Sequence, residues 1–98
     1  ATSVESGSAT PLEFELADNY PNPFNPGTTI RFAVPHRAQV ELRVYDTQGR
    51  LVDMLQNGTL DAGWHQVEFN GRDLASGTYV VRMEAEGFSS VKKMLMVK

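Results

Sequence analysis

The chain has 98 residues, of which 41% are hydrophobic and 21% charged, and its formal net charge is −3. This composition fits a single globular domain, and the negative charge argues against nucleic-acid binding, which needs clustered lysine and arginine. No apolar run approaches the ~20 residues of a membrane-spanning helix, and the absence of cysteine excludes disulfides and thiolate metal sites.

The first 11 residues are mostly Ser, Thr, Ala and Gly, a composition that predicts a flexible linker. They have neither the basic start nor the apolar segment of a signal peptide, and no initiator methionine precedes them. We therefore expect residues 1–11 to link an upstream cargo domain, missing from this sequence, to a folded domain of residues 12–98.

From residue 12 onward, apolar and polar residues alternate with the period of two that is typical of half-buried strands. The first predicted strand, residues 12–16, would bury Leu12, Phe14 and Leu16. The others are predicted over residues 28–34, 38–46, 51–56, 64–69, 78–86 and 90–98. Turn signals separate them, notably Asn57-Gly58 and Gly87, and no segment has helical spacing. The pattern predicts an all-β fold, a seven-stranded antiparallel immunoglobulin-like β-sandwich.

The segment YPNPFNPG at residues 20–27 combines three prolines, two asparagines and two aromatic residues. Its prolines restrict the backbone, and Asn22 and Asn25 are expected to bond to the backbone two residues on. Pro26-Gly27 suits a type II turn, and Tyr20 and Phe24 would anchor the loop in the core. The segment is thus either a rigid corner that protects a sheet edge or a recognition surface.

The last predicted strand is apolar on both faces. One face carries Val91, Lys93, Leu95 and Val97, and the other carries the residues Lys92, Met94, Met96 and Lys98. This favours either a strand covered on both sides or one whose outer, methionine-rich face meets a partner. A core strand with protective lysines is the simpler alternative.

No catalytic or metal-binding motif is evident. His36 and His65 lack ligand spacing, Asp18 and its neighbouring asparagines form no calcium-loop pattern, and no activated serine is apparent. We expect no enzyme activity, no cofactor and no metal. Trp64 is the exposed ring best suited to contact a sugar, although one aromatic residue does not make a carbohydrate platform.

Four segments in order resemble a known family: FELADNYPNPFNPGTTIRFAVP, VELRVYDTQGRLVDML, DAGWHQVEFNGRDLASGTYVVRM and the terminal KKMLMVK. They are similar to type A C-terminal sorting domains of the bacterial type IX secretion system, from about residue 14 to residue 98. The resemblance implies a seven-stranded sandwich at the end of an enzyme or adhesin that a Bacteroidetes-like bacterium exports.

The resemblance also implies partners and compartments. The outer-membrane translocon would recognise the domain after it folds in the periplasm, and the cargo would reach the outer-membrane surface or the medium. In many members a sortase-like peptidase removes the domain and joins the cargo to an anionic lipopolysaccharide. The corresponding cleavage region here is the linker around residues 1–12.

The resemblance maps the family motifs onto three segments of this sequence: Asn19 to Pro26, Gly77 with Tyr79, and Lys92 and Lys93 with the strand to Lys98. The expected translocon and sortase contacts are Tyr20, Pro21, Asn22, Pro23, Phe24, Asn25, Pro26, Gly77, Tyr79, Lys92, Lys93, Met94, Met96 and Lys98. Two other functions remain open, an accessory carbohydrate-binding module and a structural immunoglobulin-like module of a secreted multidomain enzyme. We expect the isolated domain to be a monomer.

Overall fold

A computed structural model describes residues 10–98, so most of the predicted linker, residues 1–9, lies outside the described part. The described chain contains seven strands and every strand pair is antiparallel, which confirms the predicted fold class. The strands are β1 (Glu15–Leu16), β2 (Gly27–Val34), β3 (Ala38–Tyr45), β4 (Leu51–Leu60), β5 (Gly63–Asn70), β6 (Gly77–Ala85) and β7 (Phe88–Met96).

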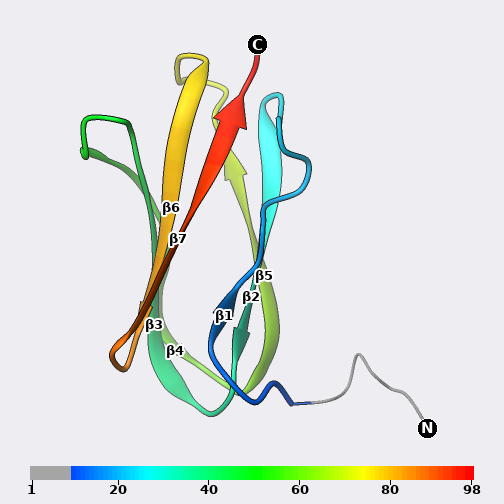
Figure 1. Cartoon of the computed structure of the whole chain (residues 1–98), viewed down its shortest axis with the longest axis vertical. Helices are drawn as coiled ribbons and strands as arrows, with labels where there is room; N and C mark the ends of the chain where they lie inside the picture. Colours follow the sequence, from blue (N-terminus) through cyan, green and yellow to red (C-terminus); the bar gives the residue numbers. More distant parts are fainter. Residues whose placement is uncertain (1–9) are drawn as a thin grey trace, which may run out of the picture.

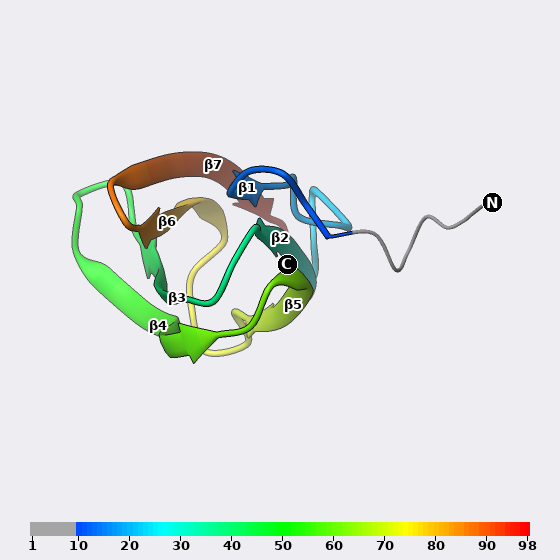
Figure 2. The same ribbon diagram turned by 90° about the horizontal axis from the view of Figure 1, so that it is seen from below.

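The strands form two sheets that face each other (Figure 1). One sheet has the order β1-β2-β5 and the other has the order β4-β3-β6-β7. Seen end-on, β1 lies beside β7 at one side of the sandwich and β4 lies beside β5 at the other (Figure 2). The chain enters at one end of the long axis, near residue 10, and Lys98 lies at the opposite end (Figure 1).

The core lies between the sheets and is built by the inward faces that the alternation predicts. The central contributors are fully or almost fully buried: Ile30, Phe32, Val34, Val40, Leu42, Val44, Phe69, Tyr79, Val81, Met83 and Ala85. Burial of these side chains supplies the main driving force for folding. Among residues 10–98 no helix long and apolar enough to cross a membrane is present.

The first strand is shorter than predicted. Leu12 is 94% exposed, and β1 pairs with β2 only through Glu15 opposite Ala33 and Leu16 opposite Phe32. This register would place Leu12 beyond the end of β2, where it has no strand to pack against. Phe14 instead packs at the end of the sandwich, stacked on Phe88 with the ring centroids 5.7 Å apart.

The turn predicted at Asn57-Gly58 is also wrong. Both residues lie inside β4, where Asn57 pairs with Glu41 and Gly58 pairs with Val40. β4 therefore runs on to Leu60, and the connection to β5 is made by residues 61 and 62. The final hairpin turn is as predicted, because Gly87 has a φ of 85° and Ala85 pairs with Phe88 across it.

Candidate recognition surface

The segment that we call the proline loop, residues 19–26, lies along the outer edge of β7. The Phe24 amide donates to the Leu95 carbonyl, and the Val97 amide donates to the Phe24 carbonyl, each over 2.9 Å. These bonds form a parallel bridge between Phe24 and Met96. The C-terminal half of β7 is thus paired with β6 on one side and with the proline loop on the other.

Asn22 extends this pairing through its side chain. Its Nδ2 donates to the Lys93 carbonyl over 3.3 Å, and its Oδ1 accepts from the Leu95 amide over 3.0 Å. The carboxamide therefore acts like a peptide group of a neighbouring strand. The predicted local bond to the backbone two residues on is wrong for Asn22, because its partners lie on β7.

A second asparagine fixes the start of the loop from inside. Asn19 is buried, and its Nδ2 donates to the Pro21 carbonyl over 3.2 Å and to Thr28 Oγ1 over 3.1 Å. The hydroxyl of Thr28 in turn donates to the Pro21 carbonyl over 2.8 Å. This network pairs Asn19 Nδ2, the Thr28 hydroxyl and the Pro21 carbonyl, and it holds the loop against β2, whereas Asn19 Oδ1 has no hydrogen-bond partner within residues 10–98. The alternation of apolar and polar residues in the sequence did not identify this network, because buried polar residues do not follow an apolar pattern.

Only one of the two predicted aromatic anchors enters the core. Phe24 is 2% exposed, and its ring centroid lies 5.9 Å from that of Phe69 in an edge-on arrangement. Tyr20 is 81% exposed, so its prediction as an anchor is wrong. Its backbone pairs with Thr29, which lies between the buried Thr28 and Ile30, and paired residues point to the same face of a sheet.

The predicted type II turn at Pro26-Gly27 is absent. Gly27 starts β2 opposite Asn70, and it is not among the glycines with positive φ. The Pro26 carbonyl instead accepts from the Gly71 amide over 2.9 Å. The loop is therefore tied to the β5–β6 connection as well as to β7.

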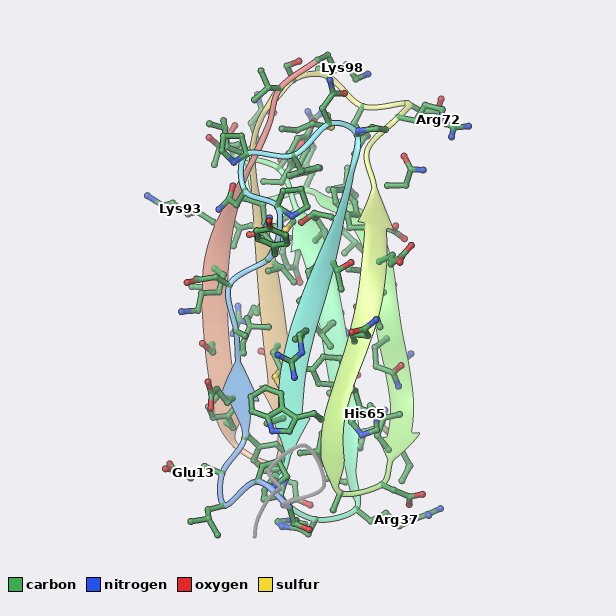
Figure 3. All side chains as sticks on the ribbon, turned by 90° about the vertical axis from the view of Figure 1, so that its right-hand side faces the viewer. Glu13, Arg37, His65, Arg72, Lys93 and Lys98 are labelled. Carbon is green, nitrogen blue, oxygen red and sulfur yellow. The ribbon has the colours of Figure 1, made fainter. Side chains whose placement is uncertain are left out.

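The methionine face of β7 points inward, so the alternative in which an outer methionine-rich face meets a partner is wrong. Met94 pairs with the buried Tyr79, and the register turns Met94 and Met96 toward the core. The outer row of the strand is Val91, Lys93 and Leu95, and Figure 3 shows Lys93 pointing away from the molecule. In the folded domain, a partner at this strand meets the outer row and not the methionines.

The other residues of the predicted set have structural contacts. Lys92 is half-buried, and its Nζ lies 3.5 Å from Asp18 Oδ1. The Tyr79 hydroxyl donates to the Ala75 carbonyl over 2.6 Å. Lys98 lies at the end of the sandwich near Arg72, to whose carbonyl its Nζ donates over 2.8 Å (Figure 3). Gly77 begins β6 opposite Met96.

The predicted contact set therefore divides into buried, exposed and half-buried members, the last being Pro26, Gly77 and Lys92. Phe24, Tyr79, Met94 and Met96 are buried and hold the loop and β7 in place. The exposed members are Tyr20, Pro21, Asn22, Pro23, Asn25, Lys93 and Lys98. The outward residues Val91 and Leu95, which the motif did not single out, complete the surface. We call the seven exposed residues, together with Val91 and Leu95, the loop–strand surface.

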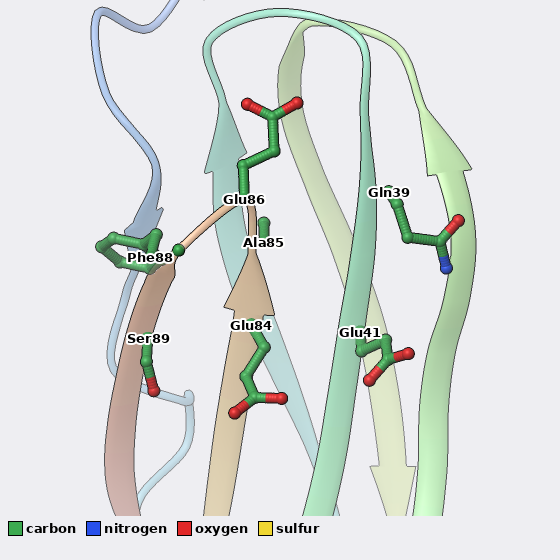
Figure 4. Close-up of a pocket in the computed structure, with 8 residues that line it drawn as sticks. Gln39, Glu41, Glu84, Ala85, Glu86, Phe88 and Ser89 are labelled. Carbon is green, nitrogen blue, oxygen red and sulfur yellow. The ribbon is translucent and has the colours of Figure 1, made fainter.

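No chemical site was found elsewhere on the described part of the chain. Between residues 10 and 98, no group of three or more His, Cys, Asp or Glu side chains could hold a metal ion. A hollow at the hairpin end of β6 and β7 is lined by Glu41, Glu84 and Glu86 (Figure 4). Each of these carboxylates has its own cationic or histidine partner at 2.7–2.8 Å.

Trp64 lies on the outer face of β5, as predicted, but its ring is not fully available. The guanidinium carbon of Arg31 lies 4.9 Å from the ring centroid, in a cation–π arrangement. One ring face is therefore occupied by the protein itself. His65 stacks on Phe32, with the ring centroids 5.5 Å apart, which gives it a packing role.

Comparison with protein families gives a match that covers most of the chain. Residues 18–98 match the family model described as a secretion system C-terminal sorting domain. Comparisons with curated proteins and with solved structures found no match. The family match begins just before the proline loop and ends at Lys98, so it includes both halves of the loop–strand surface. The chain therefore belongs to the family of type IX secretion C-terminal sorting domains.

Proposed function

We propose that the type IX secretion machinery recognises this domain through the loop–strand surface. Family membership supports the general role, a C-terminal sorting signal for a protein exported across the outer membrane. The observation that supports the specific surface is the pairing of the proline loop with β7 through Phe24 and Asn22. Two segments more than 70 residues apart in sequence thereby form one continuous recognition element.

The position of this surface suits a docking role. It lies toward the end of the molecule that carries Lys98, whereas residue 10, which leads to the linker, lies at the other end (Figure 1). The principal extents of the structure are 44 × 27 × 16 Å. A partner can therefore bind the terminal strand while the linked cargo projects from the opposite end.

The loop–strand surface carries out recognition and not chemistry. Its exposed members are prolines, amides, aliphatic side chains, lysines and the phenol of Tyr20, and within residues 10–98 none has an acid–base partner that would make it a nucleophile. The domain acts as a non-catalytic sorting signal that directs its cargo through the periplasm to the cell surface or the medium.

Removal of the domain by a sortase-like peptidase is the second part of the proposal. Cleavage would fall in or next to the linker, upstream of β1. The described end of this segment supports access, because residues 10–14 form no strand and Leu12 is 94% exposed. Exposed segments without regular structure are the preferred sites of proteolytic cleavage.

The test is export of a periplasmically targeted fluorescent reporter fused to the 98-residue chain in a type IX-competent host. Leu95→Ser changes the loop–strand surface at a side chain that is 44% exposed. Leu51→Ser, at a side chain that is 53% exposed on β4, is the matched control. We expect the unchanged fusion and Leu51→Ser to reach the surface and Leu95→Ser to be retained. Equal export of the two serine variants would contradict the proposed surface.

A further inference from the structure

The outer face of the four-stranded sheet contains an open hollow of about 590 Å³. It lies between the turn at residues 46–49 and the outer row of β7, and its volume is within the ~300–1,000 Å³ range of ligand pockets. Its lining combines two aliphatic side chains, Val80 and Val91, with two cations, one carboxylate and the polar residues Tyr45, Thr47 and Thr78. It is separate from the acidic hollow at the hairpin end of the same sheet.

Strand register explains the lining. Val80 of β6 lies between Tyr45 of β3 and Lys93 of β7, since it pairs with both. In the next row, Arg82 pairs with Val91, whose side chain is 56% exposed. The apolar floor of the hollow therefore consists of Val80 on β6 and, diagonally across from it, Val91 on the edge strand β7, which is left in contact with water.

The charges around this floor are uneven. Arg82 forms an ion pair with Glu84 over 2.7 Å, and Asp46 forms one with Arg50 over 3.0 Å. Within each pair the positive and negative charges largely cancel. Within residues 10–98, no carboxylate lies within salt-bridge distance of Lys93. The hollow thus presents an apolar floor with one uncompensated positive charge on its rim.

We propose that this hollow binds an extended acidic and apolar segment of a protein of the secretion machinery. An aliphatic side chain of the segment would cover Val80 and Val91, and a neighbouring carboxylate would pair with Lys93. The inference rests on the proposed function and names the chemistry of the partner. It also extends the loop–strand surface, with which the hollow shares Val91 and Lys93, across the sheet to β6 and β3.

Two synthetic peptides test the chemistry directly. The ¹⁵N-labelled 98-residue chain is titrated with a hexapeptide of alternating leucine and glutamate, and separately with one of alternating leucine and lysine. We expect the acidic peptide to shift the amide signals of Val80, Val91 and Lys93, and the basic peptide to leave them in place. Shifts that are absent or scattered over the molecule would overturn the inference.

Charge reversal at one residue gives a second readout. Lys93→Glu should weaken binding of the acidic peptide about tenfold and improve binding of the basic peptide, because a rim attraction becomes a repulsion. Asn22 bonds to residue 93 through that residue's backbone carbonyl alone, and its other bond is to the Leu95 amide, so the substitution leaves the loop contacts intact. Arg72→Glu, an exposed charge reversal at the end of the molecule, should change neither affinity. Equal effects of the two variants would also overturn the inference.

The same variants in the reporter fusion separate this inference from the proposed function. If the unchanged fusion is exported, we expect Lys93→Glu to reduce export and Arg72→Glu to leave it unchanged. Normal export of Lys93→Glu would refute the role of the hollow while leaving the sorting function in place. If even the unchanged fusion stays in the periplasm, the sorting function fails, and with it the identity of the partner.

Discussion

Asn22 provides the sharpest test of how the proline loop holds the terminal strand. Asn22→Ala removes one hydrogen bond of 3.0 Å and one of 3.3 Å to the backbone of β7. Hydrogen bonds contribute ~0.5–1.5 kcal/mol each, and water can partly replace them at this exposed site, so we expect a loss of about 1.5 kcal/mol. For a domain of this size that loss lowers Tm by about 6–12 °C.

Hydrogen exchange locates the effect of this substitution. The Leu95 amide donates to Asn22 Oδ1, so its exchange should accelerate in Asn22→Ala, whereas the Val97 amide keeps its bond to the Phe24 carbonyl. Thermal unfolding by circular dichroism and exchange followed by NMR measure the two effects.

Asn25→Ala is a matched control, because Asn25 is also exposed, also precedes a proline and belongs to the same loop. No hydrogen bond of its side chain is found within the described residues. We expect its Tm to change by less than about 3 °C, as for an ordinary surface substitution. Equal Tm values for the two variants, or unchanged exchange at Leu95, would refute the reasoning.

Three further outcomes are expected. Phe24→Ala should lower the free energy of unfolding by about 3–5 kcal/mol, measured in urea, because it empties a buried site in the core. Gly71→Ala should cost about 1–3 kcal/mol, since its Cβ would overlap the Met96 sulfur, and Met96→Val should reduce that cost in a double-mutant cycle. The backbone N–H of Arg50 helps hold the pKa of Asp46 below its ordinary 3.8. The stability that this bond gives to the folded state is therefore present above pH 3.8 and should be lost as the pH falls through the lowered pKa of the folded protein. Asp46→Asn should flatten this pH dependence in urea midpoints.

Each of these three expectations can be contradicted by a specific measurement. Tyr20→Ala, which removes an exposed ring from the same loop, should change the free energy of unfolding by less than about 0.5 kcal/mol; a loss as large as that of Phe24→Ala would mean that the loop is anchored differently. Additive effects of Gly71→Ala and Met96→Val would show that the two residues do not pack together. If the urea midpoint of Asp46→Asn fell at low pH as much as that of the unchanged protein, the loss of stability in acid would belong to other carboxylates.

The strands whose alternation is unbroken could be predicted from sequence with their correct faces. In β2, β3 and β6 the inward residues repeat at every second position, so a shift by one residue would expose the whole apolar set. β4 lacks this constraint. Its pairing with β3 changes register between Leu42 and Arg43 and again between Val44 and Tyr45, so its pattern is irregular and its length was underestimated.

The candidate surface was located by its motifs, but its construction was not predictable. Both faces of β7 are apolar, so only the pairing with β6 decides that the methionines face inward. Asn22 bonds to backbone atoms more than 70 residues away, and such a contact leaves no trace in a local pattern. Asn19 begins the N-terminal motif, but its buried bonding role was not predicted, since the role of a buried polar side chain depends on its partners.

The central claim is that this domain is a sorting signal for type IX secretion. Its most direct test is surface display of a reporter fused to the 98-residue chain, compared between a host with an active type IX translocon and an otherwise identical host in which the translocon is inactivated. A reporter fused to a copy lacking residues 90–98 serves as the third sample. We expect surface or medium fluorescence only for the complete domain in the competent host. Display without the translocon, or retention of the complete fusion in the competent host while it is folded, would contradict the account.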